Sequence, residues 1–278
     1  MGAALGHLRL APGSVRVTNM PGAGGGVAFA HTLSLRQRDS GLIVAASPST
    51  TLRLAQGQYG GFTERDVRWV AALGAEYGVM AVNRDAPWRD LSDLVVSWRT
   101  DPASLISGGG SAVAGQDHMK VLLLAKRAGL NPRRIRYVPF DGGGEALTAL
   151  LGGFIQVFSG EASEIEGQLD AGAVRLLAVL SPDRLTGSLA GVPTAREQGI
   201  PLDWITWRGF YVPGGISDSA YGRWVAALTR VAESPTWTEA RARYGLQPWF
   251  LAGDEFRAAV ERQVEDFRAL SREIGLLR

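Results

Sequence analysis

The sequence predicts an α/β protein with two domains. Short apolar runs rich in valine, leucine and aromatic residues alternate with amphipathic stretches, and glycine, proline or aspartate bounds most of them. This alternation favours βαβ units and largely parallel sheets. The length of 278 residues leaves room for one or two domains with a real core.

The apolar runs give the strands and the helical periods give the helices. We expect strands at residues 15–18, 42–46, 69–73, 78–82, 105–107, 136–138, 155–158, 176–180 and 209–212. Helices are expected at residues 27–38, 114–128, 144–151, 164–169 and 194–198. In the second of these helices, Met119, Leu122 and Leu123 lie on one face, with Lys120 elsewhere on the wheel.

The C-terminal part has a different character. Residues 217–278 read as one helix after another, with a short apolar break at 247–251. In the last helix Asp254 is the expected cap, and Phe256, Val260 and Val264 recur at helical spacing. The two strand-and-helix groups separate at residues 83–90 and rejoin near 209–215, which predicts two α/β domains.

Composition excludes several classes of function. The chain has no cysteine, so disulfides, thiolate zinc sites, iron–sulfur clusters and cysteine nucleophiles are absent. The net charge is +2, and the basic residues are nearly all dispersed arginines mixed with acids, Lys120 and Lys126 being the exceptions. Without a basic block, we expect no nucleic-acid partner.

No catalytic, metal or nucleotide motif is present. The three histidines, His7, His31 and His118, lack metal-ligand spacing, and Val27 stands where a dinucleotide loop needs glycine. We therefore expect no catalytic residue, no metal and no cofactor. No apolar run approaches the roughly 18 residues of a membrane span. The first ten residues turn polar too early for a signal peptide.

Glycines gather where strands should lead into helices. Three segments show this, at residues 18–26, 107–116 and 138–145, and a fourth junction at residues 46–51 (ASPSTT) supplies hydroxyls at a helix start instead. The first turn of a helix has free N–H donors and a partial positive charge, and glycine lets a ligand approach the backbone. These loops predict a bound anion, most simply a carboxylate. The alternative is that the glycines only make tight turns, which suits the 18–26 loop best.

The same residues resemble a known family. Residues 17–25 (VTNMPGAGG) are similar to the NxPGAGG signature of the extracytoplasmic solute-binding proteins of tripartite tricarboxylate transporters. Residues 137–146 (YVPFDGGGEA) followed by 150–153 (LLGG) resemble a second hallmark. Shorter matches occur at 117–118 (DH), 191–199 (GVPTAREQG) and 207–215 (WRGFYVPGG). In family order, the resemblance covers residues 13 to 278.

The resemblance implies a two-domain, class II periplasmic-binding-protein fold with a ligand cleft between the domains. One domain comprises residues 1–82 plus 213–278, and the other residues 83–212. The implied function is capture of a small carboxylate for the integral-membrane subunits of a transporter, by a periplasmic monomer without enzymatic activity.

Carried over by position, the resemblance also implies the ligand-binding residues. They are Ser47, Ser49 and Thr50; Gly110, Ser111, Gly115 and Gln116; and Phe140, Asp141, Gly142 and Gly143. Glu161 stands in a further wall and would favour a ligand with an amine, the alternative being a solvated acid at a helix start.

One departure from the family leaves alternatives open. Members normally begin with a signal peptide, a strand and a PxGGG loop, whereas this sequence opens near the end of the helix that follows them. We therefore expect the first domain to lack its first strand. The alternatives are an enzyme acting on an anionic substrate, with Asp117–His118 or Asp141 and Glu145 as the acid–base pair, and a truncated cytoplasmic remnant or sensor partner.

Overall fold

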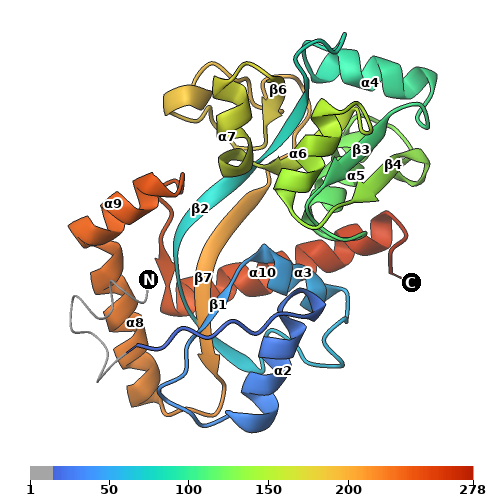
Figure 1. Ribbon diagram of the computed structural model, residues 1–278. Coiled ribbons are helices and arrows are strands. Elements are labelled where there is room, and N and C mark those ends of the chain that lie inside the picture. The colour runs from blue at the N-terminus through green and yellow to red at the C-terminus, as the bar shows by residue number, and fades with distance from the viewer. Residues whose placement is uncertain (1–14, 278) are drawn as a thin grey trace. The chain divides into compact units, whose positions relative to one another are not determined.

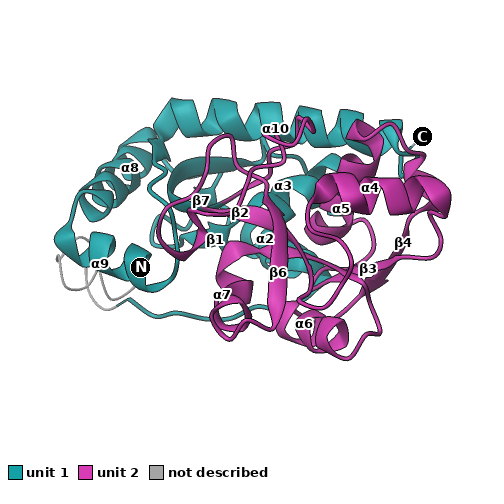
Figure 2. Cartoon of the chain, turned by 90° about the horizontal axis from the view of Figure 1, so that it is seen from above, with its two compact units in different colours: residues 1–75, 207–278 teal, residues 76–206 magenta. Residues whose placement is uncertain are grey.

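The computed structural model describes residues 15–277 and has a mixed α/β fold (Figure 1). The chain divides into two compact units, coloured separately in Figure 2. Unit 1 comprises residues 1–75 and 207–278, and unit 2 comprises residues 76–206. Both crossings between the units lie inside strands, β2 (Val67–Asn83) and β7 (Ile205–Pro213). The boundaries expected from the sequence, 82/83 and 212/213, lie in the same two strands.

Unit 1 is built from helices around the parts of β2 and β7 that it contains. Its other elements are η1 (Ala23–Gly25), α2 (Gly26–Leu35), β1 (Val44–Ala46), α3 (Pro48–Ala55), α8 (Asp218–Ala232), α9 (Pro235–Arg243), β8 (Leu251–Ala252) and α10 (Gly253–Glu273). Here β1 pairs antiparallel with β7, and β8 pairs antiparallel with β2. Val70, Val212 and Leu228 are among the fully buried residues of its core. The long helix α10 packs on α3, where Thr51 Oγ1 donates to Gln263 Oε1.

Unit 2 contains a sheet with helices packed on it. Besides its parts of β2 and β7, its elements are α4 (Leu91–Thr100), β3 (Ile106–Gly109), α5 (Gln116–Arg127), η2 (Pro132–Arg134), β4 (Arg136–Pro139), α6 (Gly143–Leu151), β5 (Val157–Glu161), α7 (Ala162–Asp170), β6 (Val174–Val179) and η3 (Gly187–Leu189). The central strand β3 pairs parallel with β4 and β5, whereas β2 pairs antiparallel with β5 and β6. Val79, Phe158 and Ile165 are among the fully buried core residues.

The expectation of largely parallel sheets is wrong. Within residues 15–277, β3 pairs parallel with β4 and β5 and an isolated parallel bridge joins Val179 to Thr194, whereas the β1–β7, β2–β5, β2–β6 and β2–β8 pairs are antiparallel. The alternation of strands and helices along the chain shows how the strands are connected. It does not show which strands become neighbours in the sheet. Here β2 enters unit 2 in the opposite direction to β5 and lies beside it.

The two strands expected at 69–73 and 78–82 are one strand, β2. Gly74 follows the first expected strand and Gly78 begins the second, and both lie within the regular strand β2. At Gly78 a Cβ would lie 2.7 Å from Lys120 Cδ and 3.1 Å from Leu180 Cδ1, so this glycine allows close side-chain packing. Gly78 therefore lies where two side chains approach the strand backbone closely, and it does not mark a turn.

Four further expectations are corrected. Residues 15–18 form no strand, and residues 195–199 are turns that follow an isolated bridge at Thr194 instead of a helix. Helix α4 was not expected; Asp90 caps it, accepting a hydrogen bond from Asp93 N at 2.9 Å. Asp254 does not cap α10: the N-cap is Ala252, and Asp254 lies in the first turn.

Candidate functional site

The glycine loops of unit 2 pack directly on one another. A Cβ on Gly110, in the loop between β3 and α5, would lie 2.4 Å from Gly143 N and 2.5 Å from Gly142 C. Only glycine permits such an approach of two backbones. Phe140 N donates to Gly109 O at 3.0 Å, which fixes the same two loops together. The structure thus brings together Gly110, Phe140, Gly142 and Gly143 of the predicted ligand-binding residues.

The start of α5 is held by polar contacts from its own loop. Gly115 is the N-cap and has no side chain to cap the helix, so Ser111 Oγ takes over and accepts a hydrogen bond from Asp117 N at 2.9 Å. Tyr137 Oη donates to Ser111 O at 2.8 Å and thereby ties this loop to β4. Ser111 therefore links the start of α5 to β4 through its hydroxyl oxygen and its carbonyl oxygen.

The start of α6 is a backbone amide turn. Gly142 is the N-cap, at φ 109°, which disfavours any residue with a side chain, and it makes no side-chain cap. Asp141 is exposed, and its N–H donates to Glu145 Oε2 at 3.2 Å. The two acids therefore form a local turn contact.

A buried ion-pair network, which the sequence pattern did not indicate, lies beneath the start of α5. Lys120 is fully buried, with Nζ 2.9 Å from Asp117 Oδ1, 3.0 Å from Glu161 Oε1 and 2.7 Å from Gly160 O. Burial acts to lower the pKa of Lys120, but the two carboxylates outweigh it and raise that pKa above its ordinary value. The lysine therefore stays charged and joins α5 to the end of β5.

Glu161 takes part in this network from the N-cap of α7. It is only 8% exposed, and its Oε1 also accepts from Thr206 Oγ1 at 3.0 Å, while Oε2 is buried with no hydrogen-bond partner. Burial raises the pKa of Glu161 to about 7 against the opposing charge of Lys120. The alternative interpretation of Glu161 was a solvated acid at a helix start. Glu161 does stand at a helix start, but its side chain is buried and not solvated. The role with a ligand amine stays a prediction.

Gln116 lies in the same region. Its Oε1 is 3.5 Å from Thr206 Oγ1, the hydroxyl that also contacts Glu161. The predicted ligand residues Ser111, Gln116 and Glu161 are therefore linked within unit 2 through one set of polar contacts. From the helical period alone, Lys120 was expected away from the apolar face of its helix. A lysine four residues after the 107–116 glycine loop was the sequence signal that could have indicated its buried ion pairs.

Asp117 and His118 do not act on each other as an acid–base pair. Asp117 Oδ1 pairs with Lys120, whereas His118 Nδ1 accepts a hydrogen bond from Ala114 N at 3.0 Å. The imidazole stacks on Tyr137 with ring centroids 4.5 Å apart. Burial lowers the pKa of His118 to about 4, so the ring is neutral near pH 7. His118 is therefore a buried histidine held by local contacts at the start of α5.

The predicted residues of unit 1 stand at the start of α3. Ser47 is its N-cap, with Oγ accepting from Ser49 N at 3.3 Å. Thr50 is buried, and Ser49 is partly exposed. The hydroxyls expected at a helix start are thus present here, and their contact with a ligand stays a prediction.

The glycine loop at residues 22–26 has a structural role. Gly22, Gly24 and Gly25 have positive φ, and Tyr59 Oη donates to Gly24 O at 2.6 Å. A Cβ on Gly26 would lie 2.9 Å from the Tyr59 ring. The loop is therefore shaped to pack on Tyr59 within unit 1.

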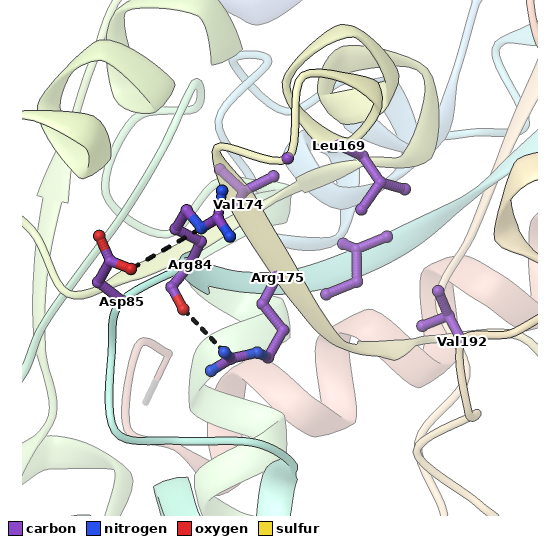
Figure 3. Close-up of a pocket in the computed structure, with 8 residues that line it drawn as sticks. Arg84, Asp85, Leu169, Val174, Arg175 and Val192 are labelled. Atoms are coloured by element: carbon purple, nitrogen blue, oxygen red, sulfur yellow. Dashed lines mark hydrogen bonds and ion pairs between the residues drawn. The ribbon is translucent and has the colours of Figure 1, made fainter.

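A separate pocket of about 490 Å³ opens elsewhere in unit 2 (Figure 3). Its lining residues are Arg84, Asp85, Leu169, Gly172, Val174, Arg175, Leu176 and Val192. Arg175 is engaged by the backbone, donating to the carbonyls of Arg84, Ala86 and Trp88 at 2.7–3.0 Å. None of the predicted ligand residues lines this pocket. Its Arg175 holds the turn that follows β2.

Neither a metal nor a membrane span is indicated. In residues 15–277 no group of three or more histidine, aspartate or glutamate side chains is arranged to hold a metal ion. Within the same residues no helix combines the length and apolarity needed to cross a membrane.

Comparison with known proteins decides the family. The family model described as "Tripartite tricarboxylate transporter family receptor" matches residues 4–276. The chain belongs to this family. A UPF0065 protein of Bordetella pertussis is 24% identical, covering 99% of this chain and 84% of that protein.

Solved structures of the TctC family and of periplasmic binding proteins show the same fold. A Rhodopseudomonas palustris protein solved with adipate has a TM-score of 0.83 and 20% identity, covering 99% of this chain and 90% of that one. MatC of Rhodopseudomonas palustris, solved with bound malate, has a TM-score of 0.78 and 20% identity, covering 97% and 90%. The predicted α/β fold of periplasmic binding proteins is confirmed. The family consists of solute-binding receptors.

Proposed function

We propose that this chain is a receptor that captures a small carboxylate, a di- or tricarboxylate or a related organic acid, for the membrane subunits of a tripartite tricarboxylate transporter. The observation that supports this most directly is the packing of Gly110 on Gly142 and Gly143. It sets the loop before α5 against the first turn of α6, and both helix starts have backbone N–H groups that suit an anion.

The family and its structural relatives support the same ligand class. Two proteins of the same fold were solved with adipate and malate, which are both dicarboxylates. Receptors of this family are periplasmic, and we propose that location for this chain, acting as a monomer without a cofactor. As a receptor it is expected to release its ligand unchanged, which product analysis by NMR after prolonged incubation tests.

Calorimetric titration tests the ligand class. Succinate, malate, adipate, citrate and glutamate form a suitable panel, with thermal shift as the second readout. A ligand at 100 times its Kd should stabilise the native state by about 2.7 kcal/mol. A folded chain that responds to none of them would contradict the proposal.

Ser111→Asp tests the loop before α5. The new carboxylate stands where the ligand anion is proposed to bind, so it should weaken binding at least tenfold, about 1.4 kcal/mol. Ser188→Asp, at an exposed position in η3, adds the same charge outside the glycine loops and should leave Kd unchanged. Equal affinity of both variants would remove the 107–116 loop from the site.

The unit 1 residues are tested separately. Ser49→Ala removes a partly exposed hydroxyl at the start of α3 while keeping the N-cap contact to Ser47 Oγ, which comes from the backbone. If Ser49 donates to the ligand, Kd should rise by a factor of about 2–10, the usual range for one net hydrogen bond. An unchanged Kd would limit the ligand contacts to the loops of unit 2.

A further inference from the structure

The tip of the 107–116 loop is both exposed and strained. Ala112 and Val113 are exposed, and Gly115 N donates to Ala112 O at 2.7 Å, which closes a tight turn. Ala114, inside this turn, has φ 63°, a left-handed conformation that a residue with a side chain rarely adopts. Such a conformation persists where surrounding contacts impose it, so the contacts of this turn carry information about its role.

Two stacked rings hold the turn from both ends. His118 Nδ1 accepts a hydrogen bond from Ala114 N at 3.0 Å, and Tyr137 Oη donates to Ser111 O at 2.8 Å. The two rings stack on each other, with centroids 4.5 Å apart and planes inclined by 21°. We call this pair the ring clamp: His118 on α5 and Tyr137 on β4. It fixes Ser111 and Ala114 relative to the helix and the strand on either side of the loop.

Both rings keep the protonation state that these hydrogen bonds require. Burial lowers the pKa of His118 to about 4, so near pH 7 the ring is neutral and Nδ1 can accept from a backbone amide. Burial also raises the pKa of Tyr137, so its hydroxyl stays protonated and can donate. Asp117 and Lys120 act electrostatically on Tyr137, and they are paired with each other at 2.9 Å.

We propose that the ring clamp holds the 107–116 loop in its ligand-binding conformation, with His118 and Tyr137 as positioning residues that act through Ser111 and the start of α5. This rests on the proposed carboxylate-binding function. A loop that is already ordered loses no conformational freedom when the ligand arrives, so the apparent affinity follows the fraction of chains in which the loop is ordered.

Variants that remove one hydrogen bond and keep the stacked ring test the proposal. Tyr137→Phe removes the bond to Ser111 O, and His118→Phe removes the acceptor for Ala114 N. His118→Asn is the conservative variant, because its side-chain oxygen keeps an acceptor. The matched control is Tyr221→Phe in unit 1, where Tyr221 Oη also donates to a backbone carbonyl, that of Trp69, at 2.8 Å.

Two quantities are measured for each folded chain. One is Kd for succinate, malate and adipate, and the other is the hydrogen-exchange rate of the Gly115 amide in the ligand-free chain. Tyr137→Phe and His118→Phe should each speed this exchange and raise Kd by about 2–10-fold, the usual range for one net hydrogen bond.

The remaining chains separate positioning from a general loss of stability. The double variant should raise Kd more than either single variant, and His118→Asn should stay closer to the wild type than His118→Phe. Tyr221→Phe loses an equivalent bond and should leave both quantities unchanged. Tyr137→Phe is the mildest change to the ring clamp and covers the case in which His118→Phe fails to fold.

Faster exchange with an unchanged Kd in the clamp variants would overturn the proposal while leaving carboxylate binding intact. Unchanged exchange would overturn it as well, because the loop would then be ordered without the rings. An equal rise in Kd for Tyr221→Phe would mark a global effect and have the same consequence. If folded wild-type and variant chains bind none of the three dicarboxylates, nor the wider panel, the proposed function itself fails, and this inference fails with it.

Discussion

At the scale of single residues, glycine at position 110 is required by backbone contact. The neighbouring loop approaches so closely that even a methyl group would overlap Gly143 N and Gly142 C. These atoms belong to backbone, so neither can swing aside as a flexible side chain would. The sequence shows the glycines, but only the contact distinguishes a required glycine from a permissive one.

Gly110→Ala is expected to destabilise the native state by about 1–3 kcal/mol, because overpacking forces two backbones apart. The matched control is Gly144→Ala in α6, an exposed helical position with nothing within 4 Å of the new Cβ. It should be neutral or stabilise by about 0.5–1 kcal/mol. Urea unfolding of both variants measures the difference, and equal stabilities would contradict the packing argument.

Lys120 has a role that only its buried ion pairs with Asp117 and Glu161 reveal. Lys120→Met keeps most of the side-chain volume but leaves Asp117 and Glu161 without their cation, so we expect a loss of about 3–5 kcal/mol. Arg127→Met removes a cation from an exposed position of the same helix and should change stability by less than about 0.5 kcal/mol. The free energies of unfolding at pH 8 test this; similar losses in both variants would contradict it.

At the scale of secondary structure elements, the sequence pattern identified helix caps with mixed success. It missed the N-cap of α4 and placed the N-cap of α10 at the wrong residue. Helix α4 begins with a reciprocal pair: Asp90 Oδ1 accepts from Asp93 N, and Asp93 Oδ2 accepts from Arg89 N. It was not expected from the sequence because proline and tryptophan precede it in a segment that reads as a domain linker. In α10, by contrast, an expected cap proved to be a first-turn acid.

Asp90→Ala should therefore lower stability by about 1 kcal/mol through loss of the N-cap. Ser92→Ala, two residues later and exposed, keeps the cap and serves as the control, with an expected change below about 0.5 kcal/mol. Urea midpoints and helical circular dichroism of the two variants test the assignment. An Asp90 variant as stable as the Ser92 variant would show that the cap contributes little.

At the scale of the whole molecule, two buried groups of unit 2 act in opposite directions on stability as pH changes. His118 has its pKa lowered from 6.5 to about 4, so the native state binds fewer protons than the unfolded chain between these values. Its contribution to stability is lost as pH falls through that range. Glu161 has its pKa raised from 4.5 to about 7, so its contribution is lost as pH rises through that range.

Unfolding midpoints measured from pH 4.5 to 8 should separate these two effects. Relative to the wild type, Glu161→Gln should gain stability progressively as pH rises from 4.5 to about 7. His118→Asn, which keeps an acceptor for Ala114 N, should gain as pH falls from 6.5 towards 4.5. Parallel curves for all three chains would mean that neither group titrates as its burial implies.

Much of this molecule could be predicted from local pattern. Apolar runs located β1, β3, β4, β5, β6 and β7, and helical spacing located α2, α5, α6 and α7, because burial of one face imposes a period on the residues. The glycine loops at 107–116 and 138–145 were recognised as strand-to-helix junctions for a similar local reason. Strand partners, the continuity of β2 through Gly74 and Gly78, and the turns at 195–199 were not predictable in this way.

The sequence by itself determined the fold class, the family and the position of the glycine loops, since each depends on the order of residues along one segment. The tertiary structure alone decided which loops touch, that Lys120 is buried between Asp117 and Glu161, and that Glu161 is enclosed instead of solvated. These features depend on residues far apart in the sequence, 41 positions in the case of Lys120 and Glu161. The ionisation and packing of these side chains depend on which groups lie nearby in space and on how far burial removes them from water. The spacing of residues along the chain determines neither.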